Sequence, residues 1–245
     1  MNEKPILFNS EMVRAILDGR KTQTRRAIKQ LYSNTVLEMK TDKYGTRLIE
    51  IEKDVEGVTF WKNPDGSTRR KIRGYIEPRP PFKKYDILYV REKWTRLYYV
   101  DPDGYTHYDK EMYYYAADGT PDITLYDADG FTEEDQRIRW RPSIHMPKKA
   151  ARLFLMVKDI RCERLQDISL EDCHKEGINE SYVRHEISGE VECDFSIERF
   201  ITLWDSTIKK SDFPKYGWDA NPWVWVVEFE RIKDYKGGEV EWLTK

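Results

Sequence analysis

GRKTQTRR, residues 19–26, is the stretch that determines most about the fold and the site. Its eight residues contain two threonine hydroxyls, one lysine and three arginines. Just upstream, apolar residues recur at helical spacing, at Met12, Val13, Ile16 and Leu17. Asn9 or Ser10 can cap that helix at its start, and Gly19 is a typical stop at its end. Residues 19–26 are therefore expected to follow directly on the C-terminus of a short helix.

Working outward from this stretch, strands are predicted for residues 4–8, 86–94, 151–164 and 223–232. A second helix is expected to begin at Ile168-Ser169 and to end at Gly177. Its start has the capping-box spacing, from Ser169 to Asp172, with Ile168 and Cys173 placed as a hydrophobic staple. A third helix is marked by Phe195, Ile197, Phe200, Ile201 and Trp204.

The strands do not alternate regularly with helices, which argues against a doubly wound parallel sheet. We predict an α+β fold, a mixed or antiparallel β-barrel with short peripheral helices. The length of 245 residues suits one domain over 1–245. Strand-rich insertions are expected at about 30–80 and 98–138, with hairpins around 44–45 and 63–66.

Charge and cysteine content exclude several classes of protein. The net charge of −2 provides no global basic field for non-specific duplex binding. Three cysteines without a CxxC pair do not form a secreted disulfide framework. No signal peptide and no apolar run of about 18 residues is visible, which predicts a cytoplasmic protein without a membrane partner.

Metal and nucleotide-cofactor motifs are missing from the sequence. His107, His174 and His185 lack the spacing of metal ligands, so no metal site is expected. The sequence has no P-loop, no Rossmann glycine pattern and no GxSxG motif. We therefore expect chemistry that requires no cofactor.

Lys21 and Thr24 form a candidate base and nucleophile. A threonine hydroxyl reacts only when a neighbour takes its proton, and a lysine can do so only when burial or nearby cations lower its pKa. Arg20, Arg25 and Arg26 can supply such cations. In a regular strand Lys21 and Thr24 would point to opposite faces, so the pair requires an irregular loop after Gly19. The alternative is that these cations only complement the negative end of the preceding helix.

Glu176 conflicts with a local rule, because a carboxylate is disfavoured at the C-terminal end of a helix. Such conflicts are expected at functional sites. An exposed glutamate at this position is tolerated at a cost of only a few tenths of a kcal/mol, so this pattern taken alone favours a purely structural explanation.

Contacts to a nucleobase are predicted from aromatic residues beside arginines. Trp94 and Trp140, next to Arg91 and Arg141, are candidates for base stacking, whereas Trp223 and Trp225 are expected in the core. His145 lies in a loop bounded by prolines, where it is either a substrate contact or a structural histidine.

Residues 16–26 resemble the signature of the ASCH domain family, with a glycine, then lysine two positions later and arginine five further on. Residues 86–92, which include Arg91 and Glu92, resemble its second block, with Tyr85 where a glycine is expected. Residues 168–177 resemble the third block, a helix ending in Glu-Gly. Residues 140–147 are similar to the longer members found in phages and prophages. The four blocks occur in the right order.

The resemblance implies a PUA-like β-barrel with a cleft for RNA or a nucleoside. Small bacterial ASCH enzymes deacetylate N4-acetylcytidine with a lysine, a threonine three residues on and a glutamate on a later helix. Those positions match Lys21, Thr24 and Glu176. The expected substrate contacts are Arg20, Arg26, Arg91, Glu92, Trp94 and His145.

The leading hypothesis is an amidohydrolase acting on N4-acetylcytidine or a related acylated nucleoside. The alternatives are an RNA-binding module for single-stranded RNA, a ribonuclease, and an accessory protein whose barrel only supports protein contacts. The sequence leaves the oligomeric state open.

Overall fold

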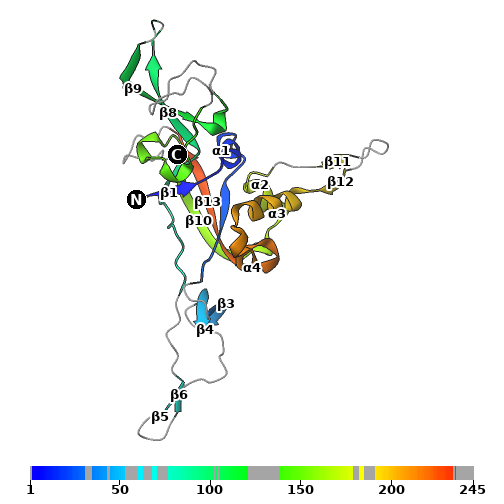
Figure 1. Cartoon of the computed structure of the whole chain (residues 1–245). Helices are drawn as coiled ribbons and strands as arrows, with labels where there is room; N and C mark the ends of the chain where they lie inside the picture. The colour runs from blue at the N-terminus through cyan, green and yellow to red at the C-terminus, as the bar shows by residue number, and fades with distance from the viewer. Residues whose placement is uncertain are drawn as a thin grey trace, which may run out of the picture.

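A five-stranded sheet forms the centre of the computed structural model (Figure 1). Its order is β1 (Glu3–Leu7), β7 (Ile87–Arg91), β10 (Phe154–Arg164), β13 (Trp223–Ile232) and β2 (Gln23–Ala27). β1 and β7 run parallel, and the other neighbours are antiparallel. The structure describes residues 2–30, 35–42, 45–52, 60–62, 68–70, 77–101, 103, 105–120, 138–178, 182–184, 191–233 and 235. The predicted α+β class is confirmed, because this part of the chain is mostly sheet with a few short helices.

The strand predicted over residues 86–94 was wrong as a single element. β7 ends at Arg91, and β8 (Trp94–Val100) begins after a two-residue break and pairs with β9 (Thr106–Tyr115). The backbone of Trp94 exchanges hydrogen bonds of 3.2 and 2.7 Å with Arg141. These bonds take up the Trp94 backbone groups, so the chain leaves the central sheet at this point.

Three further hairpins lie outside the central sheet. They are β3 (Thr35–Asp42) with β4 (Gly45–Glu52), β5 (Phe60–Lys62) with β6 (Thr68–Arg70), and β11 (Tyr182–Arg184) with β12 (Val191–Asp194). The first two confirm the predicted strand pairings, although the turn residues 43–44 and 63–67 lie outside the described residues. All three, together with β8 and β9, project away from the central sheet in Figure 1.

The three predicted helices are present as α1 (Ser10–Leu17), α2 (Leu170–Lys175) and α3 (Ser196–Thr207). A one-turn helix, α4 (Phe213–Tyr216), follows, with short 3-10 turns η1 (Ala116–Asp118), η2 (Ser143–His145), η3 (Lys148–Ala150), η4 (Leu165–Asp167), η5 (Lys210–Asp212) and η6 (Trp218–Ala220). None of the helices in the described ranges has the length and apolar character needed to cross a bilayer.

The helix caps follow the sequence, with one exception. Asn9 Oδ1 accepts from the Met12 amide at 2.8 Å, and Ser169 Oγ accepts from the Asp172 amide at 3.1 Å. The carboxylate of Asp172 does not return the bond to Ser169, because it accepts from Arg25 and Arg161 instead. Only half of the predicted capping box is therefore formed.

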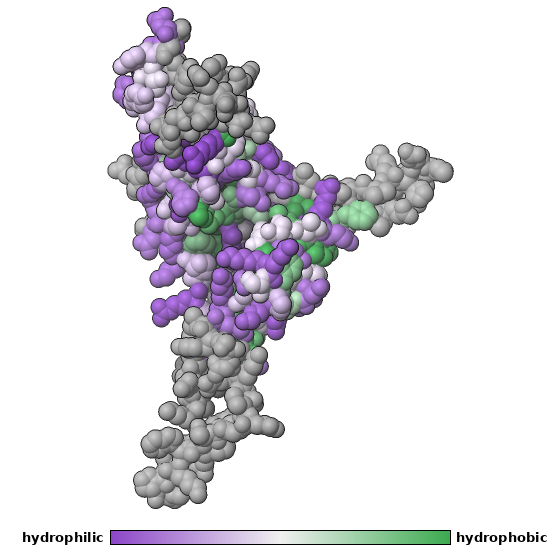
Figure 2. Space-filling view, viewed as in Figure 1, coloured by the Kyte–Doolittle hydropathy of each residue, from purple (hydrophilic) through white to green (hydrophobic). Residues whose placement is uncertain are grey.

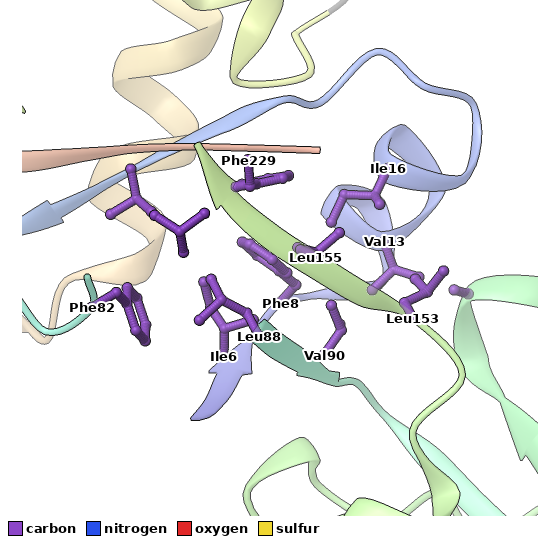
Figure 3. Packing of buried hydrophobic residues seen from close by; sticks show 13 residues of the cluster. Ile6, Phe8, Val13, Ile16, Phe82, Leu88, Val90, Leu153, Leu155 and Phe229 are labelled. Atoms are coloured by element: carbon purple, nitrogen blue, oxygen red, sulfur yellow. The ribbon is translucent and has the colours of Figure 1, made fainter. Parts of the chain in front are cut away.

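Apolar clusters cover both faces of the sheet. On one face, residues of β1, β7, β10 and β13 pack against α1, including Phe8, Val13, Ile16, Leu155 and Phe229 (Figure 3). On the other, Val224 and Val226 of β13 pack with residues of α2 and α3. The alternation of β13 side chains between the two clusters follows from the two-residue period of a strand. Hydrophilic residues cover most of the described surface seen in Figure 2.

The sheet ends at β1 on one side and at β2 on the other. No strand ladder joins these two edges in the described part of the chain, so the closed barrel stays a prediction. The edges nevertheless lie within reach of one side chain, because Arg26 Nη2 of β2 donates to the Leu7 carbonyl of β1 at 2.9 Å. The sheet is therefore strongly curved.

Tyr85, immediately before the second block, has a backbone φ of 69°. This left-handed region favours glycine and disfavours a side chain with a Cβ atom. The resemblance predicted a glycine at position 85, and the backbone conformation of Tyr85 is one that suits glycine.

Gly19 and Gly177 each follow the C-cap residue of a helix, Asp18 or Glu176, with φ of 78° and 91°. A Cβ atom at Gly19 would meet nothing within 4 Å, whereas at Gly177 it would lie 2.8 Å from Ala15 Cβ and 3.0 Å from Lys21 Cβ. Gly177 thus permits the end of α2 to approach α1 and Lys21 closely.

We predict that Gly177→Ala destabilises the protein by about 2 to 4 kcal/mol, because a left-handed backbone and steric overlap both oppose the methyl group. Gly19→Ala is the matched control, and only the backbone effect of about 1 to 2 kcal/mol is expected there. Urea unfolding followed by circular dichroism measures both. Equal losses in the two variants would show that the close approach at Gly177 is unimportant.

Candidate functional site

Lys21 lies in the irregular segment between α1 and β2, as predicted. The amides of Arg20 and Lys21 both donate to the Ala15 carbonyl, at 2.9 and 3.0 Å. The amide of Thr22 then donates to the Lys175 carbonyl at 2.8 Å. These bonds satisfy the end of α1 and bring the segment against the end of α2.

Lys21 and Glu176 form a buried ion pair. Lys21 Nζ lies 2.8 Å from Glu176 Oε2 and also donates to the Glu176 backbone carbonyl at 2.8 Å. The exposed fractions of the two side chains are 0% and 4%, so water does not screen this interaction. The structure thus brings together two of the three residues predicted to be catalytic, and Lys21 compensates the carboxylate at the unfavourable end of α2.

Thr24 and Arg26 share one face of β2. Thr24 is buried opposite Val227 of β13. The Arg26 guanidinium lies 5.5 Å from the centre of the Phe8 ring, and Lys21 Nζ lies 5.7 Å from the same ring. Phe8 therefore contributes a cation–π surface to both cations. Lys21 and Arg26 therefore lie against the same aromatic ring, and Thr24 lies on the face of β2 that carries Arg26.

Arg25 points to the opposite face of β2, and its side chain has no exposed surface. Its guanidinium contacts Glu163 at 2.5 Å, Asp172 at 2.8 Å and Glu176 at 3.1 Å. Arg161 of β10 also contacts Glu163 and Asp172, at 3.0 and 3.2 Å. Two arginines and three carboxylates therefore form a partly buried network behind the Lys21–Glu176 pair, with Arg25 and Glu176 at its buried end.

Sequence reasoning missed this network as part of the site. The signal available was the end of the strand predicted over residues 151–164, where Arg161 and Glu163 alternate with Ile160 and Cys162. Such a pattern places opposite charges side by side on one strand face. The identity of their partners depends on pairing across the sheet, which the sequence does not state.

Burial and neighbouring charges act together on the titration of these groups. Burial lowers the pKa of Lys21 below its usual value, Glu176 opposes this shift, and Arg26 and Arg25 reinforce it. Burial also lowers the pKa of Arg26, although a guanidinium stays charged at any ordinary pH. Lys21 is thus the lysine of the site whose surroundings favour the neutral amine.

Around Arg25, the effect of neighbouring charges on the pKa values outweighs the effect of burial. Burial alone would lower the pKa of Arg25, but Glu176, Glu163 and Asp172 together raise it. Burial would raise the pKa of Asp172, but Arg25 outweighs it and the pKa is lowered. Both groups are therefore held in their charged forms.

Glu92, which is buried, belongs to a second group of charges. Arg152 contacts both of its carboxylate oxygens, at 3.0 and 3.1 Å, and also contacts Asp118 at 2.6 Å. The Arg152 guanidinium stacks 4.0 Å from the centre of the Tyr115 ring. Burial raises the pKa of Glu92, and Arg152 opposes that shift. Arg152, which precedes β10, thus links Glu92 at the end of β7 to Asp118 of η1.

The other predicted substrate contacts fall near this second group or at helix ends. Arg91 Nη2 donates to the Ile144 carbonyl, and His145 is exposed on η2. Trp94 is buried, with Arg141 and Tyr113 at 5.6 and 5.9 Å from its ring. A separate link joins the ends of α1 and α2, where Arg20 contacts Gly177 and Asp18.

The two groups adjoin at the end of β1. Leu7, whose carbonyl accepts from Arg26, is the register partner of Arg91 in the parallel pairing of β1 with β7. The Phe8 amide donates to the Arg91 carbonyl at 3.2 Å. Lys21 and Arg26 on one side and Arg91 on the other therefore approach the same two residues.

No cluster of three or more His, Cys, Asp or Glu side chains suited to a metal ion is found among the described residues, which do not include His185. Comparisons with protein-family models, with curated proteins and with solved structures find no match for this chain.

We predict that Asp172→Asn destabilises the protein by about 2 to 3 kcal/mol at neutral pH, because it removes a charged acceptor shared by two arginines. The pKa of Asp172 is lowered in the folded state, so this contribution is present above the usual value of about 3.9 and is lost as the pH falls below it. Urea unfolding of both proteins between neutral and acidic pH measures the difference.

Glu171→Gln is the control, because Glu171 lies on the same turn of α2 with a side chain that is 77% exposed and pairs with Lys175. A loss below about 0.5 kcal/mol is expected. If the loss of stability in Asp172→Asn stays constant as the pH falls, the charged Asp172 carboxylate is not the source of that stability.

Proposed function

We propose that the chain is an ASCH-family protein with a PUA-like barrel and that it hydrolyses N4-acetylcytidine or a related acylated nucleoside. The catalytic set is Lys21, Thr24 and Glu176. The substrate is bound between the Arg26 side of the site and the adjoining group that contains Arg91.

The observation that carries the proposal is the arrangement around Lys21 Nζ. A neutral amine has two N–H bonds and one lone pair. Two donor positions of Lys21 are directed to Oε2 and to the backbone carbonyl of Glu176, each at 2.8 Å. With both N–H groups occupied by the same residue, the remaining tetrahedral position is available to take a proton. Burial favours that neutral form.

The reaction follows from these roles. Thr24 Oγ1 attacks the acetyl carbonyl carbon while Lys21 takes the hydroxyl proton. Collapse of the tetrahedral intermediate breaks the amide C–N bond, and Lys21 returns the proton to the cytosine amino group. Water then attacks the threonine ester while Lys21 takes its proton. The ester C–O bond breaks, Lys21 returns the proton to Thr24 Oγ1, and acetate leaves. Arg26 and a backbone N–H stabilise the negative oxygen in both steps.

The shape of the sheet supports the family proposal. Arg26 of β2 reaches the carbonyl of Leu7 in β1, so a single side chain spans the gap that a closed barrel would fill with a ladder. Tyr85 has the left-handed backbone that suits a glycine at the start of the second block. In this proposal Arg20, Arg91, Glu92, Trp94 and His145 contact or position the nucleoside.

We predict that Lys21→Met and Thr24→Val each lower kcat/KM for N4-acetylcytidine by about 100-fold or more, which is the usual contribution of a catalytic base and the nucleophile it activates. Thr22→Val is the matched control, since Thr22 is an exposed threonine two residues away. It is expected to keep nearly full activity. Release of cytidine, followed by chromatography, measures all four proteins.

Activity retained in Thr24→Val would remove the threonine nucleophile and leave Lys21 to activate water directly. A wild-type protein that releases no cytidine, but binds single-stranded RNA with an affinity that falls as salt rises, would overturn the enzyme proposal in favour of RNA binding.

A further inference from the structure

Arg25 is the buried cation that the mechanism above leaves without a role. Its Nη1 lies 3.1 Å from Glu176 Oε1, while Lys21 Nζ lies 2.8 Å from Oε2 of the same carboxylate. Each oxygen of Glu176 therefore has its own cation. Because both oxygens are held, the carboxylate plane cannot rotate without breaking one of these contacts.

Glu163 and Asp172 hold the guanidinium of Arg25 in place. Glu163 Oε1 accepts from both Nε and Nη2 of Arg25, at 3.1 and 2.5 Å, and Asp172 Oδ2 accepts from Nη2 at 2.8 Å. A planar guanidinium held by several acceptors has little freedom to turn. The geometry of Glu176 is thus fixed by residues of β10 and α2 that do not touch Lys21.

We propose that Arg25 is a positioning residue that directs Oε2 of Glu176 at Lys21 and offsets part of the carboxylate charge. Its link to turnover rests on the proposed function. Its effect on Lys21 does not.

The charged groups facing Lys21 are Glu176 from the end of α2 and Arg25 and Arg26 from β2. Phe8, which packs from the end of β1, carries no charge. Burial lowers the pKa of Lys21, Glu176 raises it, and the two arginines lower it. Without Arg25, the full charge of Glu176 would act on Lys21, and the pKa of the amine would rise.

The test variant is Arg25→Met combined with Glu163→Gln, which removes one cation and one carboxylate together. Asp172 keeps its contact with Arg161 in this variant. We expect the pH at which kcat/KM reaches half of its high-pH value to rise by roughly one unit, so that activity on the acidic side of the profile falls about tenfold. KM is expected to change little. Arg25→Lys, which keeps the charge but loses the fork, should recover part of the shift in pH.

Arg161→Met combined with Glu228→Gln is the matched control, because Arg161 contacts Glu163 and Asp172 but not Glu176. It should lower stability and move the pH dependence much less than the loss of Arg25 does. A folded Arg25→Met, Glu163→Gln protein with an unchanged pH dependence would overturn the proposal and leave Arg25 a purely structural role.

Direct titration of Lys21 separates this proposal from the proposed function. The 13Cε resonance of Lys21, assigned by its loss in Lys21→Met, reports the charge of the amine without substrate. An upward shift of its pKa in the double variant supports positioning by Arg25 even if wild type does not release cytidine. If wild type releases cytidine but the pKa of Lys21 does not shift in the double variant, the positioning role of Arg25 is rejected and the proposed function stands.

Glu163→Gln by itself covers the case in which the double variant does not fold. The Glu163 side chain is 17% exposed, and its loss leaves Arg25 in place with one acceptor fewer. More of the arginine charge then acts on Glu176 and Lys21, so the pKa of Lys21 should fall. A pKa that stays unchanged or rises in Glu163→Gln would contradict the proposal.

Discussion

The carboxylate of Glu176 is the point on which the site and much of the surrounding fold depend. It lies at the end of α2, where the helix dipole disfavours it, and it is almost completely buried. Two side chains from other elements stabilise it by donating hydrogen bonds, Lys21 from the segment after α1 and Arg25 from β2. Removing one partner of a buried pair typically costs about 3 to 5 kcal/mol, so the three elements are bound to one another.

The two faces of β2 differ in the partners that they meet. Thr24 and Arg26 face the cluster that contains Phe8, and Arg25 faces α2 and α3. A strand with cations on both faces would be unstable in an ordinary core. Here Arg26 contacts the Phe8 ring and donates a hydrogen bond to the Leu7 carbonyl. Arg25 forms ion pairs with three carboxylates. The curved sheet, with its edges close together, makes both sets of partners available.

Much of the framework could be predicted from sequence because its signals are local. The helix of α1 follows from the apolar spacing, the Asn9 cap and Gly19, and β13 follows from its run of β-formers. The same reasoning failed at residues 86–94, where the β-forming run continues past Arg91 but the strand does not. Pairing of Trp94 with Arg141, 47 positions along the chain, decides that break. Local propensity carries no information about such a partner.

In the candidate site, too, local signals could be predicted from the sequence and contacts between distant segments could not. Lys21, Thr24 and Glu176 were identified by residue type, by a local conflict at a helix end and by resemblance, and the structure places Lys21 against Glu176. The roles of Arg25, Glu163 and Asp172 were not predictable, since they arise from contacts among β2, β10 and α2.

The sequence by itself determined the helices, most of the strands and the residues able to carry chemistry. Helix periodicity, caps and turns act over a few residues, which is why they can be read directly. Tertiary structure alone decided which charges are buried, which carboxylate is shared and which face of β2 each cation occupies. Those properties depend on desolvation and on pairing between distant segments, and neither is encoded in any single stretch of the chain.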